Sequence, residues 1–181
     1  MPRIVPENPP GTRGLRRHVA LVSLSRDHHA ALMQALWLRR AGDSPNVEGA
    51  TGPAAAYLAF YRAELLGHFA DEEEVVLPLA SHADPEGASR IRSEHRELHA
   101  FTAKLSDVVS AGGDPRSLAR DIGQLLDDHV RFEERSFFMA VQAHLSPAEL
   151  AALERALQGH REARGVVLGC AVPVRTTPTS D

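Results

Sequence analysis

The sequence predicts an all-α fold, an up-down-up-down four-helix bundle with a short extra helix on its C-terminal side. Proline and glycine gather in a few clusters, and the segments between them are rich in Ala, Leu, Glu and Arg, which favour helices. No segment alternates in the manner of a strand for more than a few residues. The connections between the expected helices are short, and helices joined in this way pack antiparallel.

The helices are expected, in chain order, at residues 16–41, 53–80, 85–111, 115–144 and 147–159. The last three each begin with an N-cap residue followed by proline at the first helical position, in the pairs Asp84–Pro85, Asp114–Pro115 and Ser146–Pro147. Gly112 and Gly113 follow the third helix as a C-cap. The bundle domain is expected over residues 15–160, between a flexible N-terminal arm at 1–14 and a C-terminal tail at 161–181.

Composition excludes several classes of protein. The formal charge of −4 and the isoelectric point near 6.2 argue against a nucleic-acid or anionic-membrane surface. The longest apolar run, Gly165 to Val174, is too short to span a bilayer, and the first residues lack the apolar core of a signal peptide. The single cysteine, Cys170, fits a reducing compartment. We therefore expect a cytoplasmic protein, a monomer or a homodimer, without nucleic-acid or membrane partners.

Ten histidines are more than an ordinary domain of this length needs. Spacings of three or four residues place one of them on the apolar face of each long helix: His28, His68, His95 and His129. The second and fourth helices add a glutamate one turn later on the same face, Glu72 and Glu133. On the second helix the inward stripe is expected to continue to Leu79. His29 is rotated about 100° from His28 and is expected to lie at the flank.

These four histidines and two glutamates predict a dinuclear metal site. A glutamate on an apolar face is costly to bury without a partner, and four histidines that converge in one core would repel each other if protonated. A metal ion removes both problems because it binds neutral imidazoles and ionised carboxylates. Two glutamates from opposite helices can bridge two cations. Oxygen and nitrogen ligands without a thiolate favour iron or manganese, and zinc less naturally.

The order of these ligands resembles the hemerythrin-like (HHE cation-binding) family. The local sequences LSRDHHAAL, HFADEEEVVLPLA, SEHRELH and HVRFEERSFF carry the resemblance, which extends over residues 17–157. It implies a four-helix bundle with two non-haem iron ions, bridged by two carboxylates and an oxo or hydroxo group. His28, His68, His95 and His129 would be terminal ligands, and Glu72 and Glu133 the bridging carboxylates.

Two details bear on whether this chain resembles the oxygen carriers of the family. Those proteins use a fifth histidine from an HxxxH on the third helix, and here His99 follows His95 at that spacing, so that it is either a fifth ligand or a donor beside the site. They also use HxxxxD on the fourth helix, whereas this chain has Glu133 four residues and Glu134 five residues after His129. This departure puts reversible oxygen carriage in doubt.

The expected function is the binding of dioxygen or a related small ligand, nitric oxide or peroxide, at the di-iron centre. The alternatives are an enzyme that disproportionates peroxide or acts in nitric oxide handling or iron-cluster repair, and an iron-sensing or storage module. No catalytic residue is assigned, and no binding motif for an organic cofactor is found. Tyr61 is interpreted as a core residue or as a donor to the bound ligand, and Glu73 and Glu74 as a solvated face.

Overall fold

The computed structural model of the protein describes residues 17–165. The arm expected at 1–14 lies outside the described residues, as do residues 166–181 of the expected tail, with Cys170 and nearly all of the apolar run. Within 17–165 every regular element is helical, which confirms the predicted all-α fold. None of the helices in this range has the length and apolar character needed to cross a membrane.

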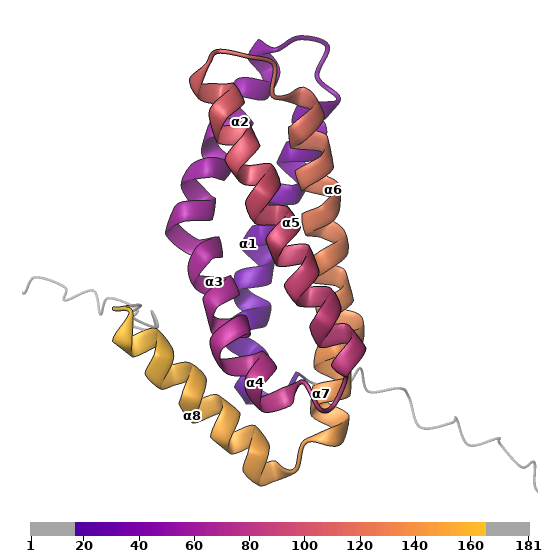
Figure 1. Ribbon diagram of the computed structural model, residues 1–181, viewed down its shortest axis with the longest axis vertical. Helices are drawn as coiled ribbons and strands as arrows, with labels where there is room; N and C mark the ends of the chain where they lie inside the picture. The colour runs from indigo at the N-terminus through magenta and orange to yellow at the C-terminus, as the bar shows by residue number, and fades with distance from the viewer. Residues whose placement is uncertain (1–16, 166–181) are drawn as a thin grey trace, which may run out of the picture.

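Four long helices and one shorter helix make up the structure (Figure 1). The first is α1 (Val19–Gly42). The second comprises α2 (Glu48–Phe60), η1 (Tyr61–Leu65), α3 (Leu66–Asp71), η2 (Glu72–Val76) and α4 (Leu77–Ala80). The third is α5 (Pro85–Ser110), the fourth comprises α6 (Arg116–Phe132), η3 (Glu133–Phe137) and α7 (Phe138–His144), and the fifth is α8 (Pro147–Ala163).

The long helices form a closed bundle. α1 packs against α2 and α6, and α5 packs against the same two helices from the other side. The contact between α1 and α6 is close because small residues face each other there. A Cβ atom on Gly123 of α6 would lie 2.8 Å from the carbonyl oxygen of Ala35 on α1. Gly123 therefore sets the approach of these two helices.

Most helix ends follow the predicted signals, with three exceptions. The fourth helix begins at Arg116 with Pro115 as its N-cap, although the side chain of Asp114 accepts a hydrogen bond from the backbone N–H of Arg116, and the last helix continues past the expected residue 159 to Ala163. Asp84 accepts a hydrogen bond from the backbone N–H of Gly87, Ser146 forms a capping box with Glu149, and Gly112 ends α5 with a φ of 68°. The second helix, however, begins at Glu48 rather than at Pro53. Pro53 therefore lies inside this helix, about one turn past its start, where it cannot donate a hydrogen bond to the preceding turn.

Three π-helical turns interrupt the long helices, and sequence periodicity did not predict them. In η2 the N–H of Leu77 bonds to the carbonyl of Glu72, and in η3 the N–H of Phe138 bonds to that of Glu133. A π turn contains one more residue than an α turn, so the buried face advances by one position. The expected inward position of Leu79 was therefore wrong: Leu79 is 42% exposed and Ala80 is fully buried.

The apolar core is divided into two clusters along the bundle. One contains Leu21 and Leu24 of α1 with Leu150, Leu153 and Leu157 of α8, and the other contains Ala31, Ala35 and Leu38 of α1 with Leu98 of α5. His28 lies between the two sets on α1. A polar layer thus separates the clusters, and α8 covers the end of the bundle nearest to the chain's first helical residues (Figure 1).

Candidate metal centre

The polar layer consists of the four histidines and two glutamates that the sequence singled out. Each long helix contributes one imidazole, and each of the six side chains is at most 5% exposed: His28, His68, Glu72, His95, His129 and Glu133. Both glutamates occupy the first position of a π turn, η2 and η3. Such turns occur frequently at functional sites.

These six residues form two groups of four that share the glutamates. His28 and His68 form one group with Glu72 and Glu133, and His95 and His129 form the other with the same two carboxylates. In each group the ligand atoms lie within 4.8 Å of one another. This spacing suits a single ion in the middle of each group.

The carboxylate oxygens lie between the two groups. Oε1 of Glu72 is 3.3 Å from Nε2 of His68, and Oε2 is 3.2 Å from Nε2 of His95. Oε2 of Glu133 is 3.1 Å from Nε2 of His28 and 3.4 Å from Nε2 of His129. Each glutamate thus faces both groups, which is the position that a bridging carboxylate requires.

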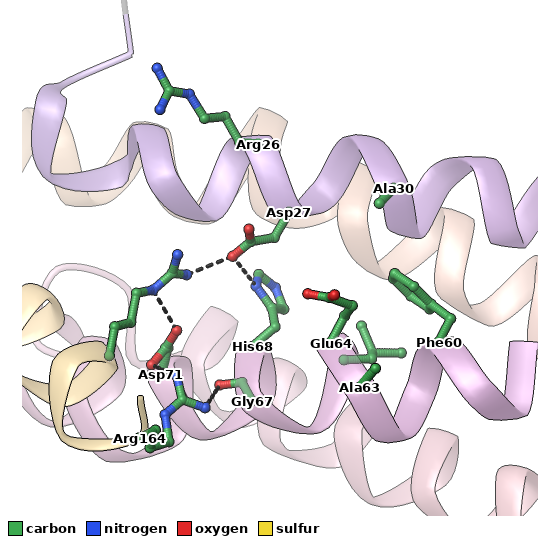
Figure 2. A pocket seen from close by; sticks show the side chains of 12 residues that line it. Arg26, Asp27, Ala30, Phe60, Ala63, Glu64, Gly67, His68, Asp71 and Arg164 are labelled. Atoms are coloured by element: carbon green, nitrogen blue, oxygen red, sulfur yellow. Dashed lines mark hydrogen bonds and ion pairs between the residues drawn. The ribbon is translucent and has the colours of Figure 1, made fainter. Parts of the chain in front are cut away.

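The outer edge of His68 borders a pocket (Figure 2). Its volume is about 430 Å³, and apolar side chains such as Phe60 and Leu65 line part of it. Asp27, Glu64 and Arg161 lie around the same space. His68 is therefore the member of the layer that this pocket reaches.

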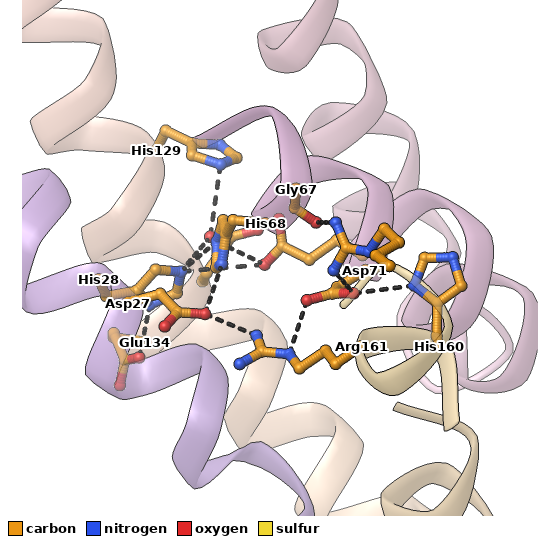
Figure 3. Close-up of polar contacts among 12 residues, drawn as sticks. Asp27, His28, Gly67, His68, Asp71, His129, Glu134, His160 and Arg161 are labelled. Atoms are coloured by element: carbon orange, nitrogen blue, oxygen red, sulfur yellow. Dashed lines mark hydrogen bonds and ion pairs between the residues drawn. The ribbon is translucent and has the colours of Figure 1, made fainter. Parts of the chain in front are cut away.

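Every one of the four histidines contacts a carboxylate through Nδ1. His28 contacts Glu134 at 2.7 Å, His68 contacts Asp27 at 3.4 Å, His95 contacts Glu73 at 2.8 Å, and His129 contacts Glu94 at 2.9 Å. Figure 3 shows the first two of these contacts beside the centre. We call these four acidic residues the carboxylate ring.

The carboxylate ring closes around the bundle. Asp27 of α1 reaches the second helix, Glu73 of the second helix reaches α5, Glu94 of α5 reaches α6, and Glu134 of η3 returns to α1. Each of these residues is the immediate sequence neighbour of a metal-layer residue on its own helix. Its side chain points away from that neighbour and toward the histidine of the adjacent helix.

The ring fixes which nitrogen of each histidine faces the centre. An ionised carboxylate only accepts hydrogen bonds, so each Nδ1 carries the proton, and the Nε2 atom of a neutral imidazole then presents a lone pair. Lone pairs on Nε2 face carboxylate oxygens at 3.1–3.4 Å, and Nε2 of His28 faces that of His68 at 3.0 Å. Such an arrangement of acceptors is repulsive unless positive charge lies among them.

The unpaired polar atoms of the core point to the same conclusion. Both oxygens of Glu72 and of Glu133, and Nε2 of His95 and His129, are buried without a hydrogen-bond partner. Buried polar atoms are normally paired, and a bound ion is one accepted reason for an exception. Oxygen and neutral imidazole donors suit iron and manganese. The residues present therefore fit a cation in each group.

The electrostatics of the layer favour ionised carboxylates and positive charge between them. Burial alone would raise the pKa of Glu72, but His68 and His95 hold it well below its usual range. Burial alone would lower the pKa of His68, but Glu72 and Asp27 raise it to about 10. Two protons or two cations can supply that positive charge, and they compete for the same nitrogen atoms.

His99 lies outside both groups. Its Nδ1 is hydrogen-bonded to the hydroxyl of Tyr61, and its ring stands edge-on to Phe69, which stacks on His95 at 4.0 Å. The structure thus places His99 beside the site, among its outer contacts. His29 is exposed, as its phase predicted.

Sequence reasoning missed the carboxylate ring. Glu73 was interpreted as part of a solvated face, and Glu134 was weighed only as a departure from a family pattern. The available signal was an acidic residue directly beside a metal-layer residue on every long helix, in the pairs Asp27–His28, Glu72–Glu73, Glu94–His95 and Glu133–Glu134. Helical periodicity alone predicts that these acidic residues face away from the core. Their histidine partners lie on the adjacent helices.

Comparison with known families identifies the domain to which this layer belongs. The model of the hemerythrin HHE cation-binding domain matches residues 19–141, which contain the first three long helices, the fourth as far as residue 141, and all six residues of the layer. Comparisons with curated proteins and with solved structures gave no match. α8 follows the matched segment.

Proposed function

The chain belongs to the hemerythrin HHE cation-binding domain family, and from this premise we propose that it holds two non-haem iron ions that bind dioxygen or a related small ligand. The observation that carries the proposal is the pair of four-residue groups that share Glu72 and Glu133. A mononuclear site would need only one of these groups. His28 and His68 would hold one ion, and His95 and His129 the other.

The ligand count leaves room for a small molecule. Each group offers two imidazoles and two carboxylates, four donors in all. Iron in nitrogen and oxygen surroundings commonly takes six ligands, and non-haem iron sites with few protein ligands use the open positions for oxygen chemistry. Dioxygen, nitric oxide and peroxide are small enough for such positions. A pair of ferrous ions held by these residues would provide two electrons, the number that reduction of dioxygen to peroxide requires.

The surrounding residues would orient the ligands and exclude water. The carboxylate ring holds each imidazole with Nε2 toward the centre, which fixes its orientation and raises its basicity. Phe69 stacks on His95, and Phe138 stacks on His28 with ring centres 5.5 Å apart. These two aromatic rings make the surroundings of the centre apolar apart from its ligands. A dry site stabilises a small bound ligand against exchange with water.

Removal of a shared ligand tests the metal assignment. We expect Glu72→Ala to lose both iron ions, because both groups lose a donor, and His68→Ala to lose the ion of its own group at least. The matched control is His29→Ala, which removes an exposed imidazole next to the layer. Iron retained at the wild-type level in Glu72→Ala would contradict the assignment.

Rapid mixing of the reduced, iron-loaded protein with each ligand tests the function. Stable binding of dioxygen or nitric oxide supports the proposal. Multiple turnovers of peroxide or nitric oxide would identify an enzyme that uses the same centre. Iron that reacts with none of the three ligands would contradict ligand binding and favour storage or sensing.

A further inference from the structure

Three basic side chains at the end of α8, two in the helix and one directly after it, converge on two acidic residues beside the metal layer (Figures 2 and 3). Nδ1 of His160 contacts Asp71 at 2.9 Å, and Arg164 is hydrogen-bonded to the same carboxylate and to the carbonyl of Gly67. Arg161 contacts both Asp71 and Asp27. Asp71 immediately precedes Glu72, and Asp27 immediately precedes His28.

Arg161 is the buried member of this cluster. Its side chain is 6% exposed, and it places Nε 2.7 Å from Oδ2 of Asp71 and a terminal nitrogen 2.6 Å from Oδ2 of Asp27. The same oxygen of Asp27 accepts the Nδ1–H of His68 at 3.4 Å. An unbroken series of contacts thus runs from α8 through Asp27 to a residue of the metal layer.

Asp27 depends on Arg161 for its position. The side chain of Asp27 is 40% exposed, and its contact with His68 is the longest of the carboxylate ring. A partly exposed carboxylate with a long contact to His68 would be better solvated if it turned toward water. Arg161 opposes this because its guanidinium is anchored on the other side by Asp71, which is 1% exposed. A guanidinium suits this bridge because its charge is spread over several nitrogen atoms: Arg161 donates a hydrogen bond to Asp27 and forms an ion pair with Asp71.

The other contacts of the ring do not involve α8. Glu134 is paired with Arg17 at 2.5 Å, and Glu94 is paired with Arg90 at 2.7 Å on its own helix. Only the group of His28 and His68 is therefore connected to α8 through these described contacts. The connection lies outside the segment that the family model matches, because Arg161 follows residue 141.

We propose that Arg161 is a positioning residue for His68, through which α8 sets how firmly the group of His28 and His68 retains its cation. This inference rests on the proposed function, since it assumes that two cations bind. Arg161 holds Asp27 against His68, and Asp27 keeps Nε2 of His68 directed at the ion. Outer partners of this kind change metal affinity by about 10- to 100-fold. The pocket that Asp27 and Arg161 help to line lies against the outer edge of His68 in this group.

The rate at which a chelator removes Fe²⁺ from the full-length protein under anaerobic conditions tests the inference. We expect Arg161→Leu to release one of its two equivalents at least about tenfold faster than the wild type, while the second equivalent keeps its rate. Arg161→Lys keeps the charge but not the two-sided bridge, so its rate should be intermediate. Arg155→Leu is the matched control, because Arg155 is an exposed arginine of the same helix.

Two further variants identify the group that is affected. Asp27→Asn should accelerate one equivalent as Arg161→Leu does, and the double variant should add little, because both changes break the same series of contacts. Glu94→Gln loosens His129 and should accelerate the other equivalent. Glu94→Gln combined with Arg161→Leu should then make both equivalents fast.

Release of both equivalents at equally increased rates in Arg161→Leu would show a general structural role and overturn the inference. So would unchanged release. If Arg161→Leu fails to fold, the partly exposed Asp27→Asn decides the matter in the same assay. A wild-type protein that does not bind two equivalents contradicts the proposed function first, which separates the two failures.

Discussion

The orientation of each imidazole is decided at the scale of single residues. Four carboxylates on the Nδ1 atoms leave four Nε2 lone pairs directed at two shared glutamates. The two shared glutamates alone would favour protonated imidazoles. The carboxylate ring alone would only orient the four imidazoles. Together they create two places in which a cation satisfies atoms that otherwise have no hydrogen-bond partner.

Glu73→Gln tests the contribution of the ring at one histidine. The amide no longer carries the charge that polarises the Nδ1–H of His95, so we expect the iron affinity of that group to fall by about 10- to 100-fold without loss of the fold. Iron-binding titrations and a circular dichroism spectrum measure both quantities. Glu97→Gln is the control, because Glu97 is exposed on the same helix as His95. Equal iron affinities in the two variants would contradict a contribution of the carboxylate ring to metal binding.

His99→Ala tests the expected fifth histidine. His99 is bonded to Tyr61 and belongs to neither group, so we expect the variant to retain both iron ions. Iron content by elemental analysis measures this directly. Loss of one iron ion would show that His99 is a ligand.

At the scale of elements, local sequence signals predicted most helix positions. They did not predict everywhere which residues of each helix face the core. N-caps with a following proline and the glycine at 112 placed most boundaries, because these signals act within one turn. The π turns at Glu72 and Glu133 leave no such local signal. The turn at Glu72 shifts the buried face so that Leu79 is exposed. A periodicity of 3.6 residues per turn cannot predict such turns.

The residues of the candidate site could likewise be predicted only in part. The six residues of the layer lie on apolar stripes and could be predicted from spacing. The partners of the carboxylate ring could not be predicted, because they belong to neighbouring helices and the relative rotation of the helices is a property of the packed bundle. The sequence shows Asp27, Glu73, Glu94 and Glu134 only as acidic neighbours of layer residues. Arg161 was equally inaccessible, since nothing in α8 alone indicates a contact with α1.

α8 also contributes apolar packing, which a core substitution measures. Leu153 is fully buried in the cluster at the covered end of the bundle. We expect Leu153→Ala to lower the free energy of unfolding by about 2–5 kcal/mol, the usual range for a buried leucine. Chemical denaturation measures the change. Arg155→Ala on the exposed side of α8 should change it little, and equal effects of the two substitutions would contradict the packing of α8 on the bundle.

At the scale of the whole molecule, the helices form a closed circuit around the layer and the carboxylate ring follows it. Each of the four long helices both supplies a histidine to the centre and supports the histidine of a neighbour. Displacement of one helix therefore disturbs two ligands. Metal binding and bundle stability are linked for this reason, since a ligand that binds only the folded state stabilises it.

The pH dependence of stability should differ between the metal-free and the iron-loaded protein. In the metal-free chain the pKa of His68 is raised from 6.5 to about 10, so its contribution is fully present below pH 6.5 and disappears as the pH rises toward 10. In the loaded protein the cation replaces these protons, so that loss should not occur. Melting temperatures between pH 6 and 10, with and without chelator, measure both curves. Parallel curves would contradict competition between protons and metal.

The central claim is that one chain holds two iron ions between shared glutamates. Elemental analysis of the purified protein, reconstituted with Fe²⁺ without oxygen and then oxidised, tests it most directly, together with the absorption spectrum. We predict two iron ions per chain and a near-ultraviolet band of a coupled ferric pair, both lost in Glu72→Ala. A single ion per chain, or a colourless protein that takes up zinc in preference to iron, would contradict the claim.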